Sequence, residues 1–361
     1  MNKRGNILFI NPIQFGYTAG YYHYCKYLIK DGFSIDYVCI DNGLLRVVMD
    51  GINVTYIKIH DKRFNWRFLF YYFLKKMNYE KYNVIILNHH RFAFLYRLFG
   101  VPARTIIDIR TGDLSSNSVA RRLWNWLIKF DSLFYDHITI LSESLRINLK
   151  VPSEKCTMLP LGADIISSSH KQFNDLCLLY VGTLYKRNIC ETIKGVALFL
   201  KNNPSMNLCY DIIGFGNKED IYELQETINN ESLQGKVIFH GRKNYTELSP
   251  FFEKSNVGIS YIPIVPYYDC QPATKTFEYI LSGMVCIATS TYENKKLINN
   301  INGVLCNDNP ESFARALEEI KENKHKYNSE AIRETLMNYT WENIIHNVMI
   351  PTLEKINSNF K

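Results

Sequence analysis

Two residues of opposite charge, Lys275 and Glu278, stand three apart in a segment whose pattern predicts a short helix. Residues three apart share one face of a helix, so we expect the two side chains to lie together. Pro272 suits the first helical position, where its missing N–H costs nothing, and Ser282-Gly283 ends the helix. The apolar residues of the predicted buried stripe are Phe277, Ile280 and Leu281.

This segment has the chemistry of an anion site. The first turn of a helix offers unpaired backbone N–H groups and the positive end of the helix dipole. A cation beside that turn, Lys275, suits a diphosphate, and a carboxylate one turn deeper, Glu278, suits the paired hydroxyls of a ribose. The alternative is a surface Lys–Glu pair, which contributes only ~0.3–0.5 kcal/mol to stability.

Further cations and glycines follow two predicted strands in the same half of the chain. Lys186 and Arg187 come after the strand Leu178–Val181, and an arginine fork matches phosphate oxygens bidentately. A solvated basic turn is the alternative. Gly214 and Gly216 follow the next predicted strand, where they would let the backbone approach a nucleotide, although an ordinary tight turn explains them equally well.

In the first half, polar residues stand at the end of the predicted strand Thr105–Ile109. Either Asp108 or Asp113 is a candidate for acid–base chemistry, whereas Asp108 could instead satisfy local backbone donors within its apolar run. His89-His90, after another strand, is a similar candidate, with a helix cap or a loop as the alternative. The sequence has no D-x-D pair and no histidine cluster, so we expect no metal ion and no cofactor.

The elements that must position these residues alternate between short apolar runs and amphipathic stretches. This pattern indicates βαβ units on parallel sheets, and it starts twice. We therefore predict an α/β protein with two Rossmann-like, doubly wound domains that face an interdomain cleft, joined by the Ser-rich stretch Gly162–Asn174. The predicted strands are Ile7–Ile10, Ile35–Cys39, Val54–Ile57, Val84–Leu87, Thr105–Ile109, His137–Leu141, Leu178–Val181, Leu208–Ile213, Val237–Phe239, Val257–Tyr261 and Val285–Thr289, and the predicted helices include Gly20–Lys30 and Cys190–Leu200.

Composition and charge limit the classes of protein and of site that are possible. A chain of 361 residues with 47% hydrophobic content is too long for one compact core and too apolar for a disordered protein. The net charge of +7 is uneven, because residues 1–164 carry 22 basic and 13 acidic residues and the remainder 20 and 22. Nine scattered cysteines without a C-x-x-C pair argue against a disulfide framework or a zinc site and favour a reducing cytoplasm.

Several stretches, in order, resemble the motifs of the GT-B glycosyltransferases, in particular the large retaining group (family 4-like, group 1). The segment Asp269–Thr289 resembles the donor-binding motif of that family. The other matching stretches are GYTAG (16–20), HITILSESL (137–145), TMLPLGAD (157–164), LYVGTL (179–184), IIGFG (212–216), VIFHG (237–241) and YTWENII (339–345).

The resemblance implies three regions and a reaction. The regions are an N-terminal acceptor-side domain at 1–165, a nucleotide-sugar-binding domain at 166–340 and a terminal helix at 341–361 that packs back onto the first domain. The reaction is the transfer of a sugar from a nucleotide-diphosphate sugar to a glycan acceptor, independent of metal and with retention. Catalytic roles then fall to Arg187, Lys275, Asp108 and Asp113, and substrate binding to Gly16, Gly182, Lys186, Gly214, Gly241, Thr274 and Glu278.

Two positions depart from the family pattern. Eight residues before Glu278, where the family usually has a glutamate, the chain has Cys270 between Asp269 and Gln271. Thr183 stands where the family often has a diphosphate-binding arginine, and we expect Arg187 to take that role. A nucleotide-sugar 2-epimerase of the same fold, or a member that binds nucleotide without turnover, remain the alternatives.

Basic and aromatic residues are interleaved in the first domain, at Phe64–Lys76 and Arg121–Phe130. Such segments suit an anionic membrane surface, and the alternative is buried helices with charged ends. The longest apolar run, Phe68–Leu74, is far short of a membrane span, and the chain starts with a strand rather than a signal peptide. We therefore expect a cytoplasmic protein at the inner face of the cell membrane. The expected acceptor is a lipid-linked intermediate of bacterial surface polysaccharide (O-antigen, lipopolysaccharide, capsule or exopolysaccharide), and no nucleic acid partner is expected.

Overall fold

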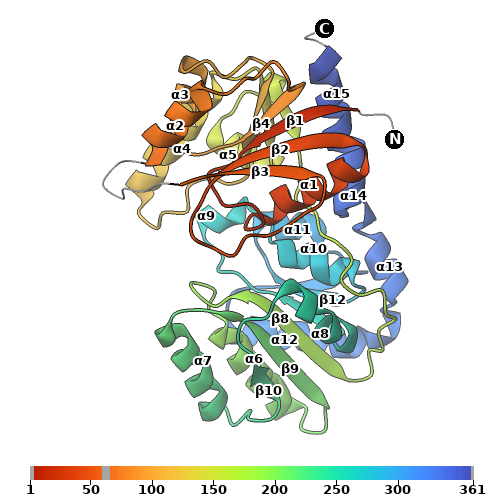
Figure 1. The fold of residues 1–361 in the computed structure, drawn as a ribbon. Helices are drawn as coiled ribbons and strands as arrows, with labels where there is room; N and C mark the ends of the chain where they lie inside the picture. Colours follow the sequence, from red (N-terminus) through yellow and green to blue (C-terminus); the bar gives the residue numbers. More distant parts are fainter. Residues whose placement is uncertain (1–3, 59–65, 359–361) are drawn as a thin grey trace. The chain divides into compact units, whose positions relative to one another are not determined.

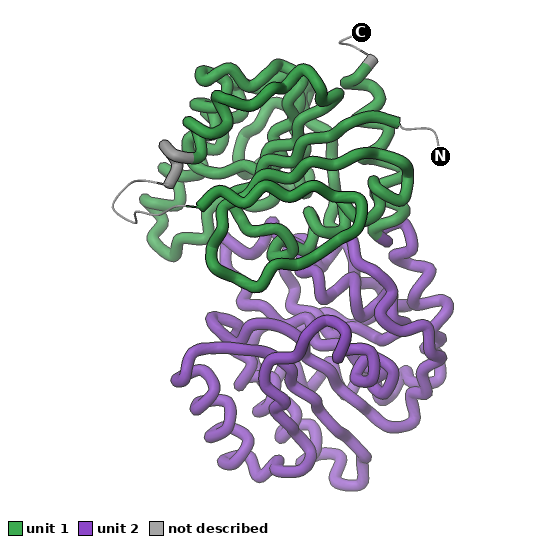
Figure 2. Tube along the Cα trace, in the orientation of Figure 1, with its two compact units in different colours: residues 1–161, 341–361 green, residues 162–340 purple. Residues whose placement is uncertain are grey.

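The computed structural model describes residues 4–58 and 66–358, and the chain folds into two compact units (Figure 2). Unit 1 comprises residues 1–161 and 341–361, and unit 2 comprises residues 162–340. Phe64 and Asn65, which begin one of the predicted basic and aromatic segments, lie outside the described residues. Among the described residues, no helix is long and apolar enough to span a membrane.

Unit 1 is built on a parallel sheet that, within its described residues, has seven strands in the order β3-β2-β1-β4-β5-β6-β7. Figure 1 labels β1 to β4 of this sheet. The strands are β1 (Gly5–Ile10), β2 (Phe33–Ile40), β3 (Ile52–Ile57), β4 (Val84–Asn88), β5 (Thr105–Ile109), β6 (His137–Ile140) and β7 (Cys156–Met158). The helices are α1 (Ala19–Lys30), α2 (Trp66–Lys75), α3 (Phe94–Leu98), α4 (Ser118–Ser132), α5 (Glu143–Leu149), α14 (Trp341–Ile344) and α15 (Ile350–Ser358). The central strands are buried on both faces, as parallel strands require.

Each face of this sheet has its own hydrophobic core. One core is formed with α2, α3, α4 and α5, through residues such as Phe70, Tyr96 and Ile128. The other is formed with α1 and with the returning segment that contains α14 and α15, whose Trp341 is 1% exposed. Trp341 stacks on His23 of α1 with ring centroids 5.3 Å apart. The final segment therefore completes the second face of the sheet.

Unit 2, whose residues are all described, is built on a six-stranded parallel sheet in the order β10-β9-β8-β11-β12-β13. The strands are β8 (Leu176–Thr183), β9 (Leu208–Phe215), β10 (Val237–Phe239), β11 (Val257–Ser260), β12 (Val285–Thr289) and β13 (Gly303–Cys306). The helices are α6 (Cys190–Asn202), α7 (Lys218–Asn230), α8 (Ser249–Lys254), α9 (Pro266–Asp269), α10 (Thr274–Leu281), α11 (Tyr292–Leu297), α12 (Pro310–Asn323) and α13 (Ser329–Glu334).

The prediction of two parallel-sheet, Rossmann-like domains is confirmed. The stretch predicted as a linker, Gly162–Asn174, is instead part of unit 2. Its Lys171 is buried, and Nζ donates to the carbonyl of Glu253 at 3.0 Å, at the end of α8. A polar composition indicated a linker, but these polar groups are used to bind the ends of neighbouring helices.

Candidate functional site

The predicted anion site lies on α10, which is fixed tightly to the second sheet. Thr276 Oγ1 lies 2.7 Å from Ser260 Oγ on β11, and the hydroxyl of Tyr279 accepts a hydrogen bond from Val181 N at 2.8 Å. The Tyr279 ring occupies the space beside Gly258, where a β-carbon would lie 2.1 Å from the ring. These contacts leave Lys275 and Glu278 on the remaining, half-buried face of the helix.

The helix begins two residues later than predicted. Pro272 is not the first helical residue; α10 starts at Thr274, with Ala273 at the N-cap. The short helix α9 ends at Asp269, so the residues between the two helices are needed to turn the chain, and Ala273 is extended with ψ 128°. Alanine provides no side-chain cap, and in the first turn Thr276 N donates to the carbonyl of Ala273 at 3.1 Å. The N–H groups of Thr274 and Lys275 receive no cap from the Ala273 side chain and could serve a ligand.

Lys275 carries a buried ammonium group. Among the described residues, Nζ has no hydrogen-bond partner, and it lies 4.0 Å from the centre of the Tyr180 ring. Burial, together with the nearby charge of Arg187, lowers the pKa of Lys275 to about 7, although Glu278 opposes the shift. A β-carbon at Gly182 would lie 3.2 Å from Nζ, so the glycine leaves room for the ammonium group.

Arg187 is the second cation of the site. Its Nη1 is buried and has no hydrogen-bond partner within the part of the chain that the structure describes. The guanidinium Cζ lies 4.4 Å from the centre of the Tyr268 ring on α9. Because Arg187 lowers the pKa of Lys275, the two cations are close enough to repel each other. A pair of buried, unsatisfied cations of this kind is matched by a multivalent anion.

Glu278 lies one turn deeper on α10 and is also strongly perturbed. Burial raises its pKa to about 7, the charge of Lys275 opposes this, and Asp164 adds to it. Tyr245 stands near the same carboxylate, and burial, with Glu278 and Asp164, raises the pKa of the phenol. Glu278 is therefore a buried acceptor whose pKa is influenced by Lys275 and Asp164.

The predicted glycines lie together at the carboxyl edge of the second sheet. Gly182 and Gly214 are paired neighbours on β8 and β9, and a β-carbon at Gly214 would lie 2.0 Å from the carbonyl oxygen of Gly182. Gly214 N donates to the carbonyl of Gly241 at 2.9 Å, and Gly241 has a φ of +69° that favours glycine. Close strand packing requires glycine at 214, and the backbone turn requires it at 241.

Lys186 is separate from this group. It is exposed, with a φ of +54°, and it lines a cavity of about 320 Å³ together with Glu191, Asp220 and Glu223. Neither Lys275 nor Glu278 lines that cavity. The structure thus brings Arg187 close enough to α10 for its charge to act on Lys275, whereas Lys186 lines a separate cavity.

In unit 1, Asp108 is fully buried, with 0% exposure, at the end of β5. Its Oδ1 accepts a hydrogen bond from Thr139 Oγ1 at 2.8 Å and lies 3.8 Å from Arg110 Nη1. Burial raises the pKa of Asp108, and the charge of Arg110 opposes the shift. The predicted alternative, that Asp108 satisfies local donors, describes this geometry, although the donors are side chains rather than the backbone.

Asp113 is closer to the surface and is paired. Arg91 Nη2 donates to its Oδ2 at 2.9 Å, and the Arg91 guanidinium lies 3.7 Å from the Trp124 ring centre. Burial alone would raise the pKa of Asp113, but hydrogen bonds from Ser115 and Arg91 outweigh it and lower the pKa.

Gly16 turns the chain after β1 with a φ of +90°, at a point where a β-carbon would lie 2.4 Å from Val47.

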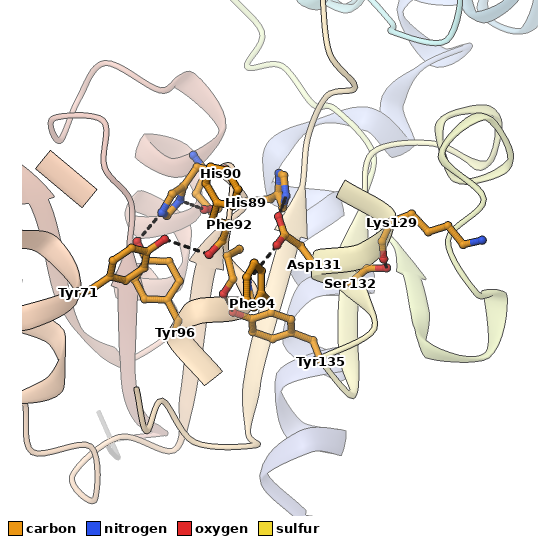
Figure 3. Close-up of polar contacts among 12 residues, drawn as sticks. Tyr71, His89, His90, Phe92, Phe94, Tyr96, Lys129, Asp131, Ser132 and Tyr135 are labelled. Atoms are coloured by element: carbon orange, nitrogen blue, oxygen red, sulfur yellow. Dashed lines mark hydrogen bonds and ion pairs between the residues drawn. The ribbon is translucent and has the colours of Figure 1, made fainter. Parts of the chain in front are cut away.

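The two histidines after β4 are held by the helices beside them (Figure 3). His89 Nε2 lies 2.9 Å from Asp131 on α4, and the Asp131 carboxylate also accepts a hydrogen bond from Phe94 N at 3.1 Å. His90 Nδ1 lies 2.9 Å from the carbonyl of Asn88, and its other ring nitrogen faces the Tyr96 hydroxyl. Both rings serve to fix the β4–α3 loop.

Comparison with known proteins identifies the second unit. Residues 175–323 match the sequence model of the family described as glycosyl transferases group 1. Unit 2 is thus similar to the group 1 glycosyl transferases. The match covers β8 to the end of α12 and includes Arg187, Lys275 and Glu278.

Solved structures extend the likeness to the whole chain. Sucrose-phosphate synthase from Thermosynechococcus elongatus has a TM-score of 0.76 at 14% identity, over 99% of this chain and 100% of that one. HepE from Anabaena, in complex with UDP and glucose, has a TM-score of 0.74 at 13% identity, over 97% and 100%. The lipopolysaccharide outer core galactosyltransferase WaaB, in its apo form, has a TM-score of 0.69 at 13% identity, over 96% and 99%. The fold is therefore GT-B, while no curated protein matches the chain in sequence.

Unit 2 has ring contacts that the sequence pattern did not signal. Tyr180 lies against Lys275 and Tyr268 against Arg187, yet both tyrosines belong to apolar runs that predict only burial. At the position where a family glutamate was expected, Cys270 is half-buried, and the adjacent Asp269 accepts a hydrogen bond from Tyr292 N at 2.7 Å. No group of three or more His, Cys, Asp or Glu residues in the described chain is placed to hold a metal ion.

Proposed function

We propose that the protein is a glycosyltransferase that takes a sugar from a nucleotide-diphosphate sugar and transfers it to a glycan acceptor. The observation that carries the proposal is the pair of buried cations in unit 2, Lys275 Nζ and Arg187 Nη1, which lack hydrogen-bond partners among the described residues. A diphosphate supplies the oxygens that such a pair requires.

Each site residue then has a part in the reaction. Lys275, Arg187 and the uncapped first turn of α10 stabilise the charge that develops on the leaving diphosphate. Glu278, one turn deeper, accepts hydrogen bonds from the ribose hydroxyls of the nucleotide. Gly182 leaves room for the Lys275 ammonium group, Gly214 and Gly241 let the neighbouring backbone segments pack at the sheet edge beside the donor, and Thr274 begins the helix whose first turn faces the diphosphate. This mechanism needs no metal ion.

The finer parts of the proposal concern the acceptor. We propose retention of configuration and a lipid-linked saccharide of bacterial surface polysaccharide as acceptor, met by unit 1 at a membrane surface. Support comes from the excess of positive charge in the first half of the chain. Asp113 and Gly16 lie at the carboxyl edge of the first sheet, where an acceptor would be bound, and Asp108 supports that edge from below.

The test is nucleotide binding followed by transfer. UDP is the first nucleotide to examine, since HepE was solved with UDP and glucose. Thermal shift with UDP, GDP and ADP, and with their sugars, should give stabilisation that is lost in Lys275→Ala and Glu278→Ala. If neither substitution weakens nucleotide binding, the site assignment is wrong. Binding without transfer to any acceptor would favour a non-catalytic member, and release of an epimerised free sugar would favour a 2-epimerase.

A further inference from the structure

The outer face of α4 is unusual because it is apolar where a surface helix is normally polar. Val119 is 72% exposed, Leu123 56%, Trp126 58% and Leu133 51%. With Phe130, which is half-buried, these residues repeat at the spacing of one helix face and its continuation. We call these five residues the α4 stripe.

Burial of the opposite face of α4 explains why the stripe points outward. Leu127 and Ile128 are 7% and 6% exposed, and Asp131 is fully buried against His89. The orientation of the helix is thus fixed by core packing and by the Asp131–His89 contact, which Figure 3 shows. The stripe is not a core face that has been left open by a loose helix.

Aromatic contacts give the stripe a rigid base. Trp126 stacks on Phe130 with ring centroids 5.5 Å apart, and Phe130 packs on Phe94 of α3 at 5.3 Å. Further large apolar side chains are exposed on the neighbouring helices, with Tyr72 of α2 at 61% and Leu98 of α3 at 65%. An exposed apolar area of this kind on a soluble fold marks an interaction surface.

The segment that contains the α4 stripe has an excess of positive charge. Residues 66–134, which contain α2, α3 and α4, have 11 Lys or Arg and 4 Asp or Glu, so their net charge of +7 equals that of the whole chain. Of the four acidic residues, Asp108 and Asp131 are fully buried and Asp113 is paired with Arg91. Arg122 on α4, Lys75 at the end of α2 and Lys76 directly after it are exposed.

We infer that the α4 stripe and the cations around it bind the surface of an anionic lipid membrane. Tryptophan and leucine enter the boundary between headgroups and acyl chains, and lysine and arginine remain at the anionic phosphates. A second copy of this chain is a poorer occupant, because two such faces would bring like charges together. The inference deepens the proposed function, since a lipid-linked acceptor is presented at a membrane, but it stands on α4 alone.

The experiment is co-sedimentation of the full chain with vesicles of mixed phosphatidylethanolamine and phosphatidylglycerol, without donor or acceptor. Trp126→Asp should reduce the bound fraction by about tenfold or more, because it removes a large apolar side chain and adds repulsion. Leu123→Asp provides a second variant of an exposed position. The matched control is Tyr222→Asp on α7, which is 65% exposed and should bind vesicles as the wild type does.

The charges are tested separately. Arg122→Gln should weaken binding by about fivefold, and ~1 M NaCl, with a screening length of ~3 Å, should remove most of the difference between anionic and neutral vesicles. Equal binding of Trp126→Asp and wild type, or equal binding to phosphatidylcholine vesicles at low salt, would overturn the inference. A wild-type dimer that Trp126→Asp converts to a monomer would also overturn it in favour of self-association.

Nucleotide binding by the same variants separates this inference from the proposed function. Trp126→Asp should keep the UDP-induced thermal shift of the wild type, because α4 belongs to unit 1 and the cation pair to unit 2. Vesicle binding without nucleotide binding would leave the inference standing and remove the proposed function.

Discussion

The two parallel sheets treat the charged residues at their carboxyl edges in opposite ways. In unit 2, Lys275 and Arg187 direct buried nitrogen atoms toward no hydrogen-bond acceptor of the described chain. In unit 1, the corresponding residues each have at least one close partner, although Asp108 Oδ2 is a buried atom without one among the described residues. These pairs are Asp113 with Arg91, His89 with Asp131, and Asp108 with Thr139.

The difference teaches how to separate binding residues from supporting residues. Buried polar groups are nearly always paired, and an unpaired buried charge is costly. An unpaired buried charge is expected where a ligand supplies the missing partner, so the cations of unit 2 are expected to contribute to binding. The paired groups of unit 1 are expected to contribute mainly to stability. Three substitutions and two pH dependences can break or sharpen this comparison.

The largest effect is expected for Asp108→Ala. The change removes the buried carboxylate beside Arg110, whose side chain is 16% exposed, so this cation keeps its hydrogen bonds to the carbonyls of Leu159 and Pro160 but loses its counter-charge. The free energy of unfolding of unit 1 should fall by about 3–5 kcal/mol. Chemical denaturation measures the change, and Asp108→Asn, which keeps an acceptor for Thr139, should cost less. An unaltered stability would show that Asp108 is not a supporting residue.

Lys275→Met should lower nucleotide affinity without lowering the stability of the protein. Nucleotide affinity should fall about 100-fold, which corresponds to ~2.7 kcal/mol, because the charge-assisted contact to the diphosphate is lost. The melting temperature of the free protein should not fall, since an uncompensated buried charge is removed. Calorimetry and thermal unfolding give both quantities, with Lys186→Met as control. A variant that loses stability but keeps affinity would place Lys275 among the supporting residues.

The pH dependence of binding follows from the low pKa of Lys275. With a pKa of about 7, the amine is mostly neutral near pH 8, and a bound diphosphate restores the proton. Binding should then take up close to one proton and weaken by up to about tenfold per pH unit above neutrality. Titration calorimetry in buffers of different ionisation enthalpy measures the uptake, which Lys275→Met should abolish.

The low pKa of Lys275 also determines the direction in which the stability of the protein changes with pH. The folded-state pKa of Lys275 lies below its ordinary value of 10.5, so the folded protein releases this proton first. The contribution of this group to stability should therefore rise with pH between about 7 and 10.5. A fall in stability over this range that disappears in Lys275→Met would contradict the assignment.

Arg187→Lys should have the smallest effect. The substitution keeps the positive charge but loses the bidentate fork and the flat contact with Tyr268, so affinity for a nucleoside diphosphate should fall by about fivefold to tenfold. Arg242→Lys, at an exposed arginine of the same unit, is the matched control. Equal losses of affinity in the two variants would show that nucleotide binding depends only on the net charge of the unit.

The fold could be predicted from the sequence because its strands are local apolar runs. The prediction Val285–Thr289 coincides with β12, and Thr105–Ile109 coincides with β5. The two short outer strands, β7 and β13, were not predicted, since three or four residues with mixed burial carry little pattern. Each is fixed at the edge of its sheet by pairing with the strand that precedes it in the chain, β6 or β12.

The candidate site could be predicted in composition but not in geometry. Residue spacing placed Lys275 and Glu278 on one helix face, and α10 confirms that they share it. Whether Lys275 is paired, however, depends on Tyr180 and Gly182 of β8, and no pattern within residues 269–289 reports that contact. The same holds for Arg187, since Tyr268 reaches it from a separate helix.

The return of the chain to the first unit has a consequence for how the protein is made. Residues Trp341, Ile345 and Leu353 belong to the core on one face of the first sheet, together with Phe9 and Tyr21 near the start of the chain. On the ribosome, that face stays open to solvent while some 180 intervening residues are synthesised, whereas residues 162–340 are continuous. Synthesis therefore completes the second unit first, and the oldest part of the nascent chain is the last to close.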